Sequence, residues 1–230
     1  MRKALWAYAV IAVAHLVSLA VGITWLEWVS KFLLVPSLAL WVLLNMGARQ
    51  ALAPKRRGPR LVVAALVLCS LGDMALQFDS LFIAGMGLFA AGHACYVTFF
   101  LRSGAAPGLR RRPWIPIGYA VVWLGFIALL WSGLGGLRIP VAAYSLLLTA
   151  TAVTSAGFGA RTGIGGALFF ISDGLISLRL ADLPQPPMPG LWIMSTYILA
   201  QYLLASGSVR AAPAPPDTHA LTYTQASSPG

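Results

Sequence analysis

Eight mostly apolar stretches, separated by short polar connectors, make up nearly all of this 230-residue chain. A helix needs about 20 apolar residues to cross the hydrocarbon core of a bilayer. The stretches are close to that length, and they cover residues 4–24, 31–52, 61–78, 81–101, 114–132, 139–158, 164–181 and 190–209. Since 59% of the residues are hydrophobic and only 10% charged, the sequence predicts an all-α fold, a polytopic transmembrane bundle of eight helices.

The positive charges predict how this bundle is oriented. If eight helices alternate in direction, all but three of the basic residues fall on one side: Arg2, Lys3, Arg49, Lys55, Arg56, Arg57, Arg60, Arg102, Arg110, Arg111, Arg112, Arg161 and Arg210. The other side has only Lys31, Arg138 and Arg179. Cytoplasmic loops of membrane proteins are enriched in Lys and Arg, so we expect both termini in the cytoplasm. The same distribution argues against nucleic acid as the partner behind the net charge of +10.

The chain is predicted to contain one folded domain. Residues 1–209 form the eight-helix transmembrane domain, and no connector is long enough to hold a soluble domain. Residues 210–230 are rich in Pro, Ser, Thr and Ala and lack apolar periodicity, which is typical of a disordered tail.

Two carboxylic acids lie deep inside predicted spans. Asp73 is in the third span and Asp173 near the middle of the seventh, whereas the remaining acids lie in connectors or the tail. An aspartate at the centre of a spanning helix costs about 2.5–3.5 kcal/mol on insertion scales, so such residues face the bundle interior and are commonly functional. Two such acids together require protonation, a cation or a polar cavity.

Other polar residues are predicted to lie near these acids. In the fourth span, Gly85, Phe89, Gly92, His93 and Tyr96 follow the spacing of one helix face, and the glycines permit close approach of a neighbouring helix.

The eighth span has Tyr197 and Gln201 one helical turn apart. Tyr144 lies in the first turns of the sixth span, and Lys31 opens the second. The predicted depths place Lys31 and Tyr144 closer to the non-cytoplasmic face than the other polar groups. We therefore expect one polar pocket that opens toward the outer half of the bilayer.

Five segments at these positions together resemble the YhhN family of membrane proteins, whose animal members are lysoplasmalogenases. They are SKFLLVP (30–36), SLGDMAL (70–76), GLFAAGHACY (87–96), ALFFISDGLISL (167–178) and YILAQYLLASG (197–207). The resemblance implies an eight-helix bundle that hydrolyses the vinyl ether bond of lysoplasmalogen. The products would be a fatty aldehyde and a glycerophospho-ethanolamine or glycerophospho-choline.

The chemistry of that bond suggests roles for the polar residues. A vinyl ether becomes an oxocarbenium-like cation when its β-carbon is protonated, after which water adds and the hemiacetal collapses. An apolar site keeps a carboxylic acid protonated as the proton donor, and a second, ionised carboxylate stabilises the cation. The predicted catalytic residues are Asp73, Asp173 and His93, with the donor left open between the aspartates. The predicted substrate-binding residues are Lys31, Tyr96, Tyr144, Ser172, Tyr197 and Gln201, and no cofactor or metal is expected.

Alternative functions remain open on the sequence alone. A proton-coupled transporter also keeps paired acids and a histidine at mid-depth, but is expected to have discontinuous helices near its site. A metal hydrolase is compatible with two aspartates and a histidine. A retinal protein requires a mid-helix lysine, and Lys3, Lys31 and Lys55 all lie at span ends or in connectors. Our prediction remains a lysophospholipid hydrolase among membrane lipids, in the inner (plasma) membrane of a bacterium.

Overall fold

The structure is a computed structural model that describes residues 2–50 and 58–210, all of them in helices or short connections. The helices are α1 (Arg2–Val21), α2 (Thr24–Gln50), α3 (Gly58–Ala75), α4 (Phe82–Arg102), α5 (Ala105–Arg111), α6 (Trp114–Leu130), α7 (Arg138–Phe158), α8 (Ala160–Leu180) and α9 (Pro189–Arg210). Two 3₁₀ turns, η1 (Asp79–Leu81) and η2 (Gly135–Leu137), precede α4 and α7. The predicted all-α fold is confirmed, and the predicted disordered tail lies outside the described residues except for Arg210.

The helices differ from the predicted spans in two places. The connector at 102–113 contains the short helix α5, which meets α6 at 89°. Helix α2 begins at Thr24 rather than at residue 31, so Lys31 lies inside a helix instead of opening it. The early start follows from a run of residues, TWLEWVS, that contains neither Gly nor Pro to stop a helix.

Five segments are long and apolar enough to cross a membrane, or up to six if the bent pair α5–α6 is one span. They are Lys3–Val21, Thr24–Asn45, Asp79–Arg102, Gly135–Phe158 and Ala160–Leu180. Helices α3 and α9 are not among them. In α9, polar residues such as Gln201 and Ser206 are buried by neighbouring helices, which shield them from lipid.

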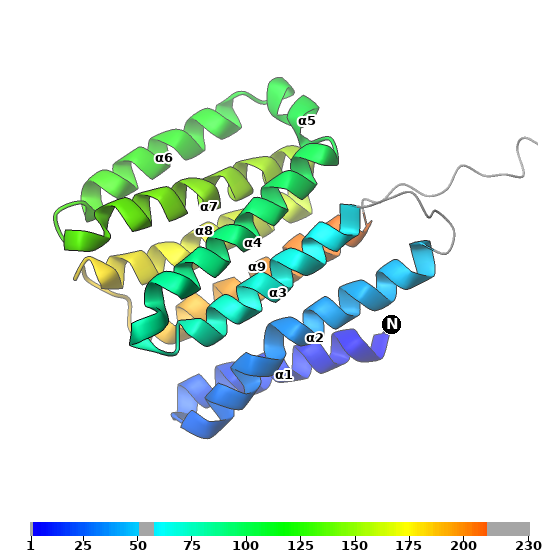
Figure 1. Ribbon diagram of the computed structural model, residues 1–230, viewed down its shortest axis with the longest axis horizontal. Helices are drawn as coiled ribbons and strands as arrows, with labels where there is room; N and C mark the ends of the chain where they lie inside the picture. Colours follow the sequence, from blue (N-terminus) through cyan, green and yellow to red (C-terminus); the bar gives the residue numbers. More distant parts are fainter. Residues whose placement is uncertain (1, 51–57, 211–230) are drawn as a thin grey trace, which may run out of the picture.

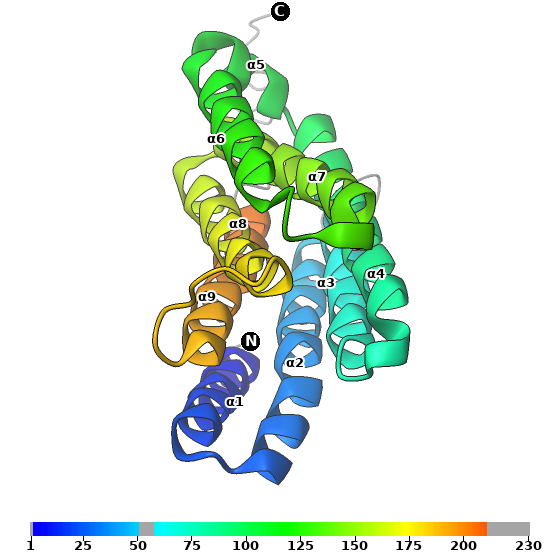
Figure 2. The same cartoon turned by 90° about the vertical axis from the view of Figure 1, so that its left-hand side faces the viewer.

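The long helices alternate in direction along the bundle (Figure 1). The start of α1 and the end of α9 lie at the same end of the bundle, as an even number of long alternating helices requires. Helix α9 contacts α8 and also α1, α2 and α3. Helix α4 joins α3 to α7, while α6 packs on α7 at the edge of the bundle (Figure 2).

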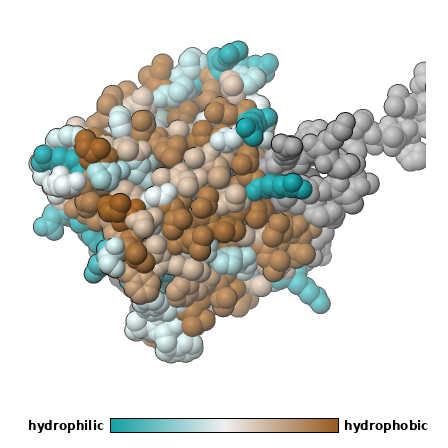
Figure 3. All heavy atoms as spheres, viewed as in Figure 1, coloured by the Kyte–Doolittle hydropathy of each residue, from teal (hydrophilic) through white to brown (hydrophobic). Residues whose placement is uncertain are grey.

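The outer surface is largely apolar. Many large hydrophobic side chains are exposed, including Val10, Val121 and Ile164, each of them more than half exposed. Figure 3 shows a broad hydrophobic surface across one face, with hydrophilic residues mainly toward its edges. A water-soluble monomer rarely exposes so large an apolar surface, whereas lipid chains cover it without cost.

Glycines bring the central helices into close contact. A Cβ atom at Gly166 of α8 would lie 2.8 Å from the Ala152 Cα of α7, and one at Gly165 would lie 2.9 Å from the Leu204 backbone nitrogen of α9. Between α3 and α4, a Cβ at Gly92 would lie 2.9 Å from the Cys69 Sγ. The predicted interior face of α4 is confirmed, because Gly85, Phe89, Gly92, His93 and Tyr96 are all buried.

We predict that Gly166→Ala destabilises the bundle by about 1–3 kcal/mol, because the added methyl overlaps the backbone of α7. Thermal unfolding of the purified protein in detergent measures this change. Gly87→Ala is the matched control, since a Cβ there meets nothing within 4 Å. Equal midpoints for the two variants would contradict the close packing of α7 and α8.

Candidate active site

The first polar chain of the bundle interior begins at Asp173 of α8. The Tyr144 hydroxyl of α7 donates a hydrogen bond to the Asp173 Oδ2. The Tyr144 oxygen also lies 3.3 Å from the His93 Nε2 of α4, and the other ring nitrogen, Nδ1, lies 3.2 Å from the Thr151 Oγ1. Asp173 and His93 are 7% and 0% exposed, so both ends of this chain are buried, while Tyr144 between them is half-buried.

A second chain begins at Asp73, near the end of α3. The Tyr197 hydroxyl of α9 donates to the Asp73 Oδ2 over 2.7 Å. The Gln201 Nε2 donates to the Tyr197 oxygen over 3.2 Å, and the Tyr96 hydroxyl donates to the Gln201 Oε1 over 2.8 Å. The donors all point toward the carboxyl group, so the dipoles of this chain add up at Asp73.

Aromatic rings lie between the two chains. The Phe169 ring centroid is 4.6 Å from that of His93 and 5.4 Å from that of Tyr197, so Phe169 contacts a member of each chain. Phe89 packs edge-on against Phe169 and Tyr197. The Asp73 charge nevertheless acts on the Asp173 carboxyl.

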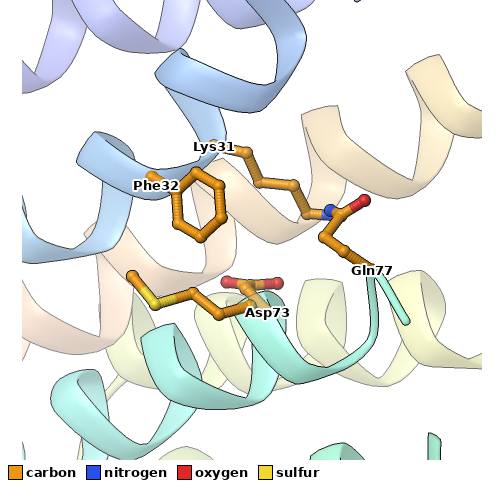
Figure 4. Close-up of a pocket in the computed structure, with 5 residues that line it drawn as sticks. Lys31, Phe32, Asp73 and Gln77 are labelled. Carbon is orange, nitrogen blue, oxygen red and sulfur yellow. The ribbon is translucent and has the colours of Figure 1, made fainter. Parts of the chain in front are cut away.

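A narrow pocket, without room for a water molecule, lies beside Asp73 between α2 and the end of α3. Lys31, Phe32, Asp73, Met74 and Gln77 line it. In Figure 4, Lys31 extends from α2 toward Gln77, and the Asp73 carboxyl group faces the same space from below. The Lys31 charge acts on the Asp73 carboxyl across this pocket.

The predicted site residues thus fall into three groups. Seven of them form the two hydrogen-bonded chains: Asp73, Tyr96, Tyr197 and Gln201 in one, Asp173, His93 and Tyr144 in the other, with Asp73 also at the pocket. Lys31 lies at the pocket. Ser172 belongs to neither chain, because its hydroxyl donates to the Ile193 carbonyl oxygen and thereby ties α8 to α9.

Sequence reasoning missed several residues of this site. Thr151 contacts His93, yet a threonine in a helix usually bonds to its own backbone and gives no signal of its own. It lies two turns after Tyr144 on the same face of α7, which is the one pattern that indicates it. Gln77 was missed because the sequence placed it inside the span 61–78, whereas α3 ends at Ala75 and leaves Gln77 in the turn that lines the pocket.

A second hollow lies on the far side of α7. It is an apolar groove of about 380 Å³ between α6 and α7, and its lining includes Trp123, Leu146 and Val153. None of the residues of the two polar chains lines it. Within the described residues, no group of three His, Cys, Asp or Glu side chains is arranged to hold a metal ion.

These features define an integral, multi-pass membrane protein with buried carboxyl, tyrosine and histidine side chains in its interior. The chain belongs to the YhhN family, whose model matches residues 26–208. It is 32% identical over 191 residues to lysoplasmalogenase TMEM86B of Homo sapiens, which covers 82% of this chain and 77% of the human protein.

Other relatives are also named lysoplasmalogenase. Lysoplasmalogenase TMEM86B of Mus musculus is 30% identical, with 80% of this chain and 77% of the mouse protein covered. Lysoplasmalogenase TMEM86A of Bos taurus is 29% identical, with 80% and 79% covered. Among solved structures, none matches the chain.

We predict that Gln201→Leu destabilises the protein by about 1–3 kcal/mol, because the buried Tyr96 hydroxyl loses its acceptor and the Tyr197 hydroxyl loses one of its two partners. In that background, Tyr96→Phe should cost less than it does alone, since its hydroxyl is already unpaired. Unfolding of the four proteins of this double-mutant cycle in detergent gives the coupling. Thr98→Val is the control, because that hydroxyl bonds only within its own helix. A cycle with additive effects would contradict the chain.

Proposed function

We propose that this protein is an intramembrane lysoplasmalogenase that hydrolyses the vinyl ether bond by acid catalysis from Asp73 and Asp173. The observation that carries the proposal is the pair of buried carboxyl groups, each held by a tyrosine from another helix, with the Asp173 carboxyl within reach of the Asp73 charge. The names of the relatives at about 30% identity support the substrate. The products are a fatty aldehyde and glycerophospho-ethanolamine or glycerophospho-choline.

The proposal includes a topology. The eight long helices each cross the bilayer, and both termini lie in the cytoplasm, in the inner membrane of a bacterium. The pocket beside Lys31 then opens at the non-cytoplasmic end, on the side of the α1–α2, α3–α4 and α8–α9 connections. This end is the one with fewer basic residues, in line with the distribution of charge in loops of membrane proteins.

The two carboxyl groups have different surroundings, which assigns them different roles. Asp73 lies near the Lys31 charge and accepts a hydrogen bond at the end of a polarised chain, so it is the ionised partner. Asp173 is buried and has the Asp73 charge nearby instead of a cation, so we assign the proton of the resting enzyme to Asp173. Asp173 is therefore the general acid and Asp73 the carboxylate that stabilises the cation.

The reaction proceeds in two stages, with both carboxyl groups restored at the end. Asp173 transfers its proton to the β-carbon of the vinyl ether, whose π electrons form the new C–H bond and leave an oxocarbenium ion. Asp73 takes a proton from a water molecule as that water adds to the cation. In the hemiacetal, Asp73 returns this proton to the glycerol oxygen, Asp173 takes the hydroxyl proton, and the C–O bond breaks to release aldehyde.

Tyr144 and His93 position the proton donor. When Asp173 is ionised, the Tyr144 hydroxyl donates to it; when Asp173 is protonated, Tyr144 turns its hydrogen toward the His93 Nε2, 3.3 Å away. In this second state the His93 Nδ1–H donates to Thr151. The histidine thus accommodates both states of the acid without leaving a buried donor unpaired.

The transporter alternative fits these helices less well. A carrier of this kind has broken helices at its binding site. Asp173 lies within the continuous helix α8 and Asp73 within α3, while the bent pair α5–α6 has none of the residues of the two chains. Uptake by sealed vesicles that depends on a proton gradient would favour the transporter instead.

We predict that Asp73→Asn and Asp173→Asn each lower aldehyde release from lysoplasmalogen by about 10²–10⁴-fold, the usual contribution of an acid or base in catalysis. Purified protein in detergent with a coupled aldehyde assay measures this loss. The saturated alkyl-ether analogue should stay intact, because it cannot be protonated at carbon. Asp182→Asn is the matched control, since this exposed residue has a positive φ of 59° that asparagine also tolerates. Wild-type rates in both site variants would refute the mechanism.

We also predict where isotopes appear in the products. In D₂O the aldehyde should gain one deuterium at the carbon next to the carbonyl, and the rate should fall because proton transfer to carbon is slow. In ¹⁸O-water the glycerophospho product should contain no label, because its own C–O bond is never broken. Mass spectrometry of both products reports this. Label in the glycerol oxygen would mean attack at the glycerol carbon and would exclude protonation of the vinyl ether.

A further inference from the structure

Three aromatic side chains form a cluster at the rim of the pocket beside Asp73. The Trp28 ring centroid lies 6.0 Å from that of Phe32 and 6.1 Å from that of Phe78. Phe32 is itself a wall of the pocket. Trp28 and Phe78 are 37% and 50% exposed, so their outer faces are accessible to a ligand that enters there.

The cluster lies beside two polar groups that suit an anion. Lys31 follows Trp28 by three residues and therefore shares its face of α2. Gln77 directly precedes Phe78 and lines the pocket opposite Lys31 (Figure 4). A cationic side chain and an amide donor thus lie next to ring faces, which attract cations.

Two acids adjoin the rim residues in the sequence. Glu27 precedes Trp28 and Asp79 follows Phe78. Along the pocket, Asp73 lies at the base and Lys31 above it, and the aromatic cluster forms the rim. A zwitterion with an inner phosphate and an outer ammonium group complements this order.

We propose that Trp28, Phe32 and Phe78 bind the alkylammonium group of a zwitterionic lysophospholipid, choline above all, whose phosphate contacts Lys31 and Gln77. This inference rests on the proposed function for the identity of the lipid. In lysoplasmalogen the vinyl ether and the phosphate occupy the two ends of one glycerol unit. The residues that recognise them therefore have to line one pocket, as Asp73 and Lys31 do. Choline is weakly hydrated, so ring faces compete with water for it better than for a primary ammonium group.

The competing interpretation is that Trp28 only anchors the protein at the membrane interface, as tryptophans near span ends commonly do. Trp192 is a suitable example of that role, because it is 55% exposed and its indole Nε1–H donates to the Pro187 carbonyl oxygen. An anchor contributes to stability in the membrane but does not distinguish one lysolipid headgroup from another. Headgroup selectivity therefore separates the two interpretations.

The test is a binding experiment with lipids that the enzyme cannot cleave. Saturated alkyl-ether lysolipids with phosphocholine or phosphoglycerol headgroups are titrated against the full-length protein in detergent. Trp28→Leu and Phe78→Leu should each weaken binding of the phosphocholine lipid by about fivefold or more, and alter binding of the phosphoglycerol lipid by less than about twofold. Trp28→Phe should restore part of the loss, and Lys31→Met should weaken both lipids. Trp192→Leu, the matched control, should change neither.

An equal effect of Trp28→Leu on both lipids would overturn the proposal, and so would unchanged binding of both. The unfolding midpoint of each variant shows whether it is folded. If Trp28→Leu is not, Phe78→Leu tests the same site. The probes are not substrates, so the result does not depend on catalysis. If the wild-type protein released no aldehyde from lysoplasmalogen yet selected phosphocholine through Trp28, the proposed function would fail while the headgroup site remained.

Discussion

The structure depends on the hydrogen bonds that two tyrosines donate to two carboxyl groups in an apolar interior. A carboxyl group buried among hydrocarbon is costly unless its oxygens find partners, and here each partner comes from a different helix. Tyr197 ties α9 to α3 through Asp73, and Tyr144 ties α7 to α8 through Asp173. Helices in lipid gain little from the hydrophobic effect, so such bonds and close packing hold them together.

The close packing around these bonds follows from small residues at the right positions. Gly165 and Gly166 let α8 lie against both α9 and α7, which sets the approach of Asp173 to Tyr144. A larger side chain at either glycine would meet the backbone of a neighbouring helix, and at Gly166 the Ser155 side chain as well. The positions of the polar side chains are thus fixed by glycines, which have no side chain.

Much of this arrangement was accessible from the sequence, because the signals are periodic. The length of the apolar runs gave the long helices, and the spacing from Gly85 to Tyr96 gave the buried face of α4. The isolated acids at membrane depth indicated Asp73 and Asp173. The spacing of residues within one helix does not show which other helix packs against it, since a polar face is compatible with several neighbouring helices. The pairing of Tyr96 with Gln201, 105 residues apart, therefore needed the structure.

Other features depended on details that no pattern contains. Ser172 was grouped with the site because it adjoins Asp173, yet adjacent residues of a helix point about 100° apart, and Ser172 bonds to the backbone of α9. The sequence did not predict the aromatic contacts of Trp28, because α2 begins at Thr24 and the predicted span began only at residue 31. Seven residues of helix before Lys31 turn Trp28 toward the end of α3, where Phe78 lies.

Asp73 has a special position because it belongs to both the buried network and the pocket. Its Oδ2 accepts the hydrogen bond from Tyr197, so one side of the carboxyl group is committed to the interior. The other side faces Lys31 and Gln77 across the pocket. If both aspartates act on one bond, that bond has to lie between Asp73 and Asp173, deeper than the pocket. The rings of Phe89 and Phe169 occupy this space. The reaction on this route requires these two rings to turn aside, and the alkenyl chain of the substrate is an apolar group that can take their place among the helices.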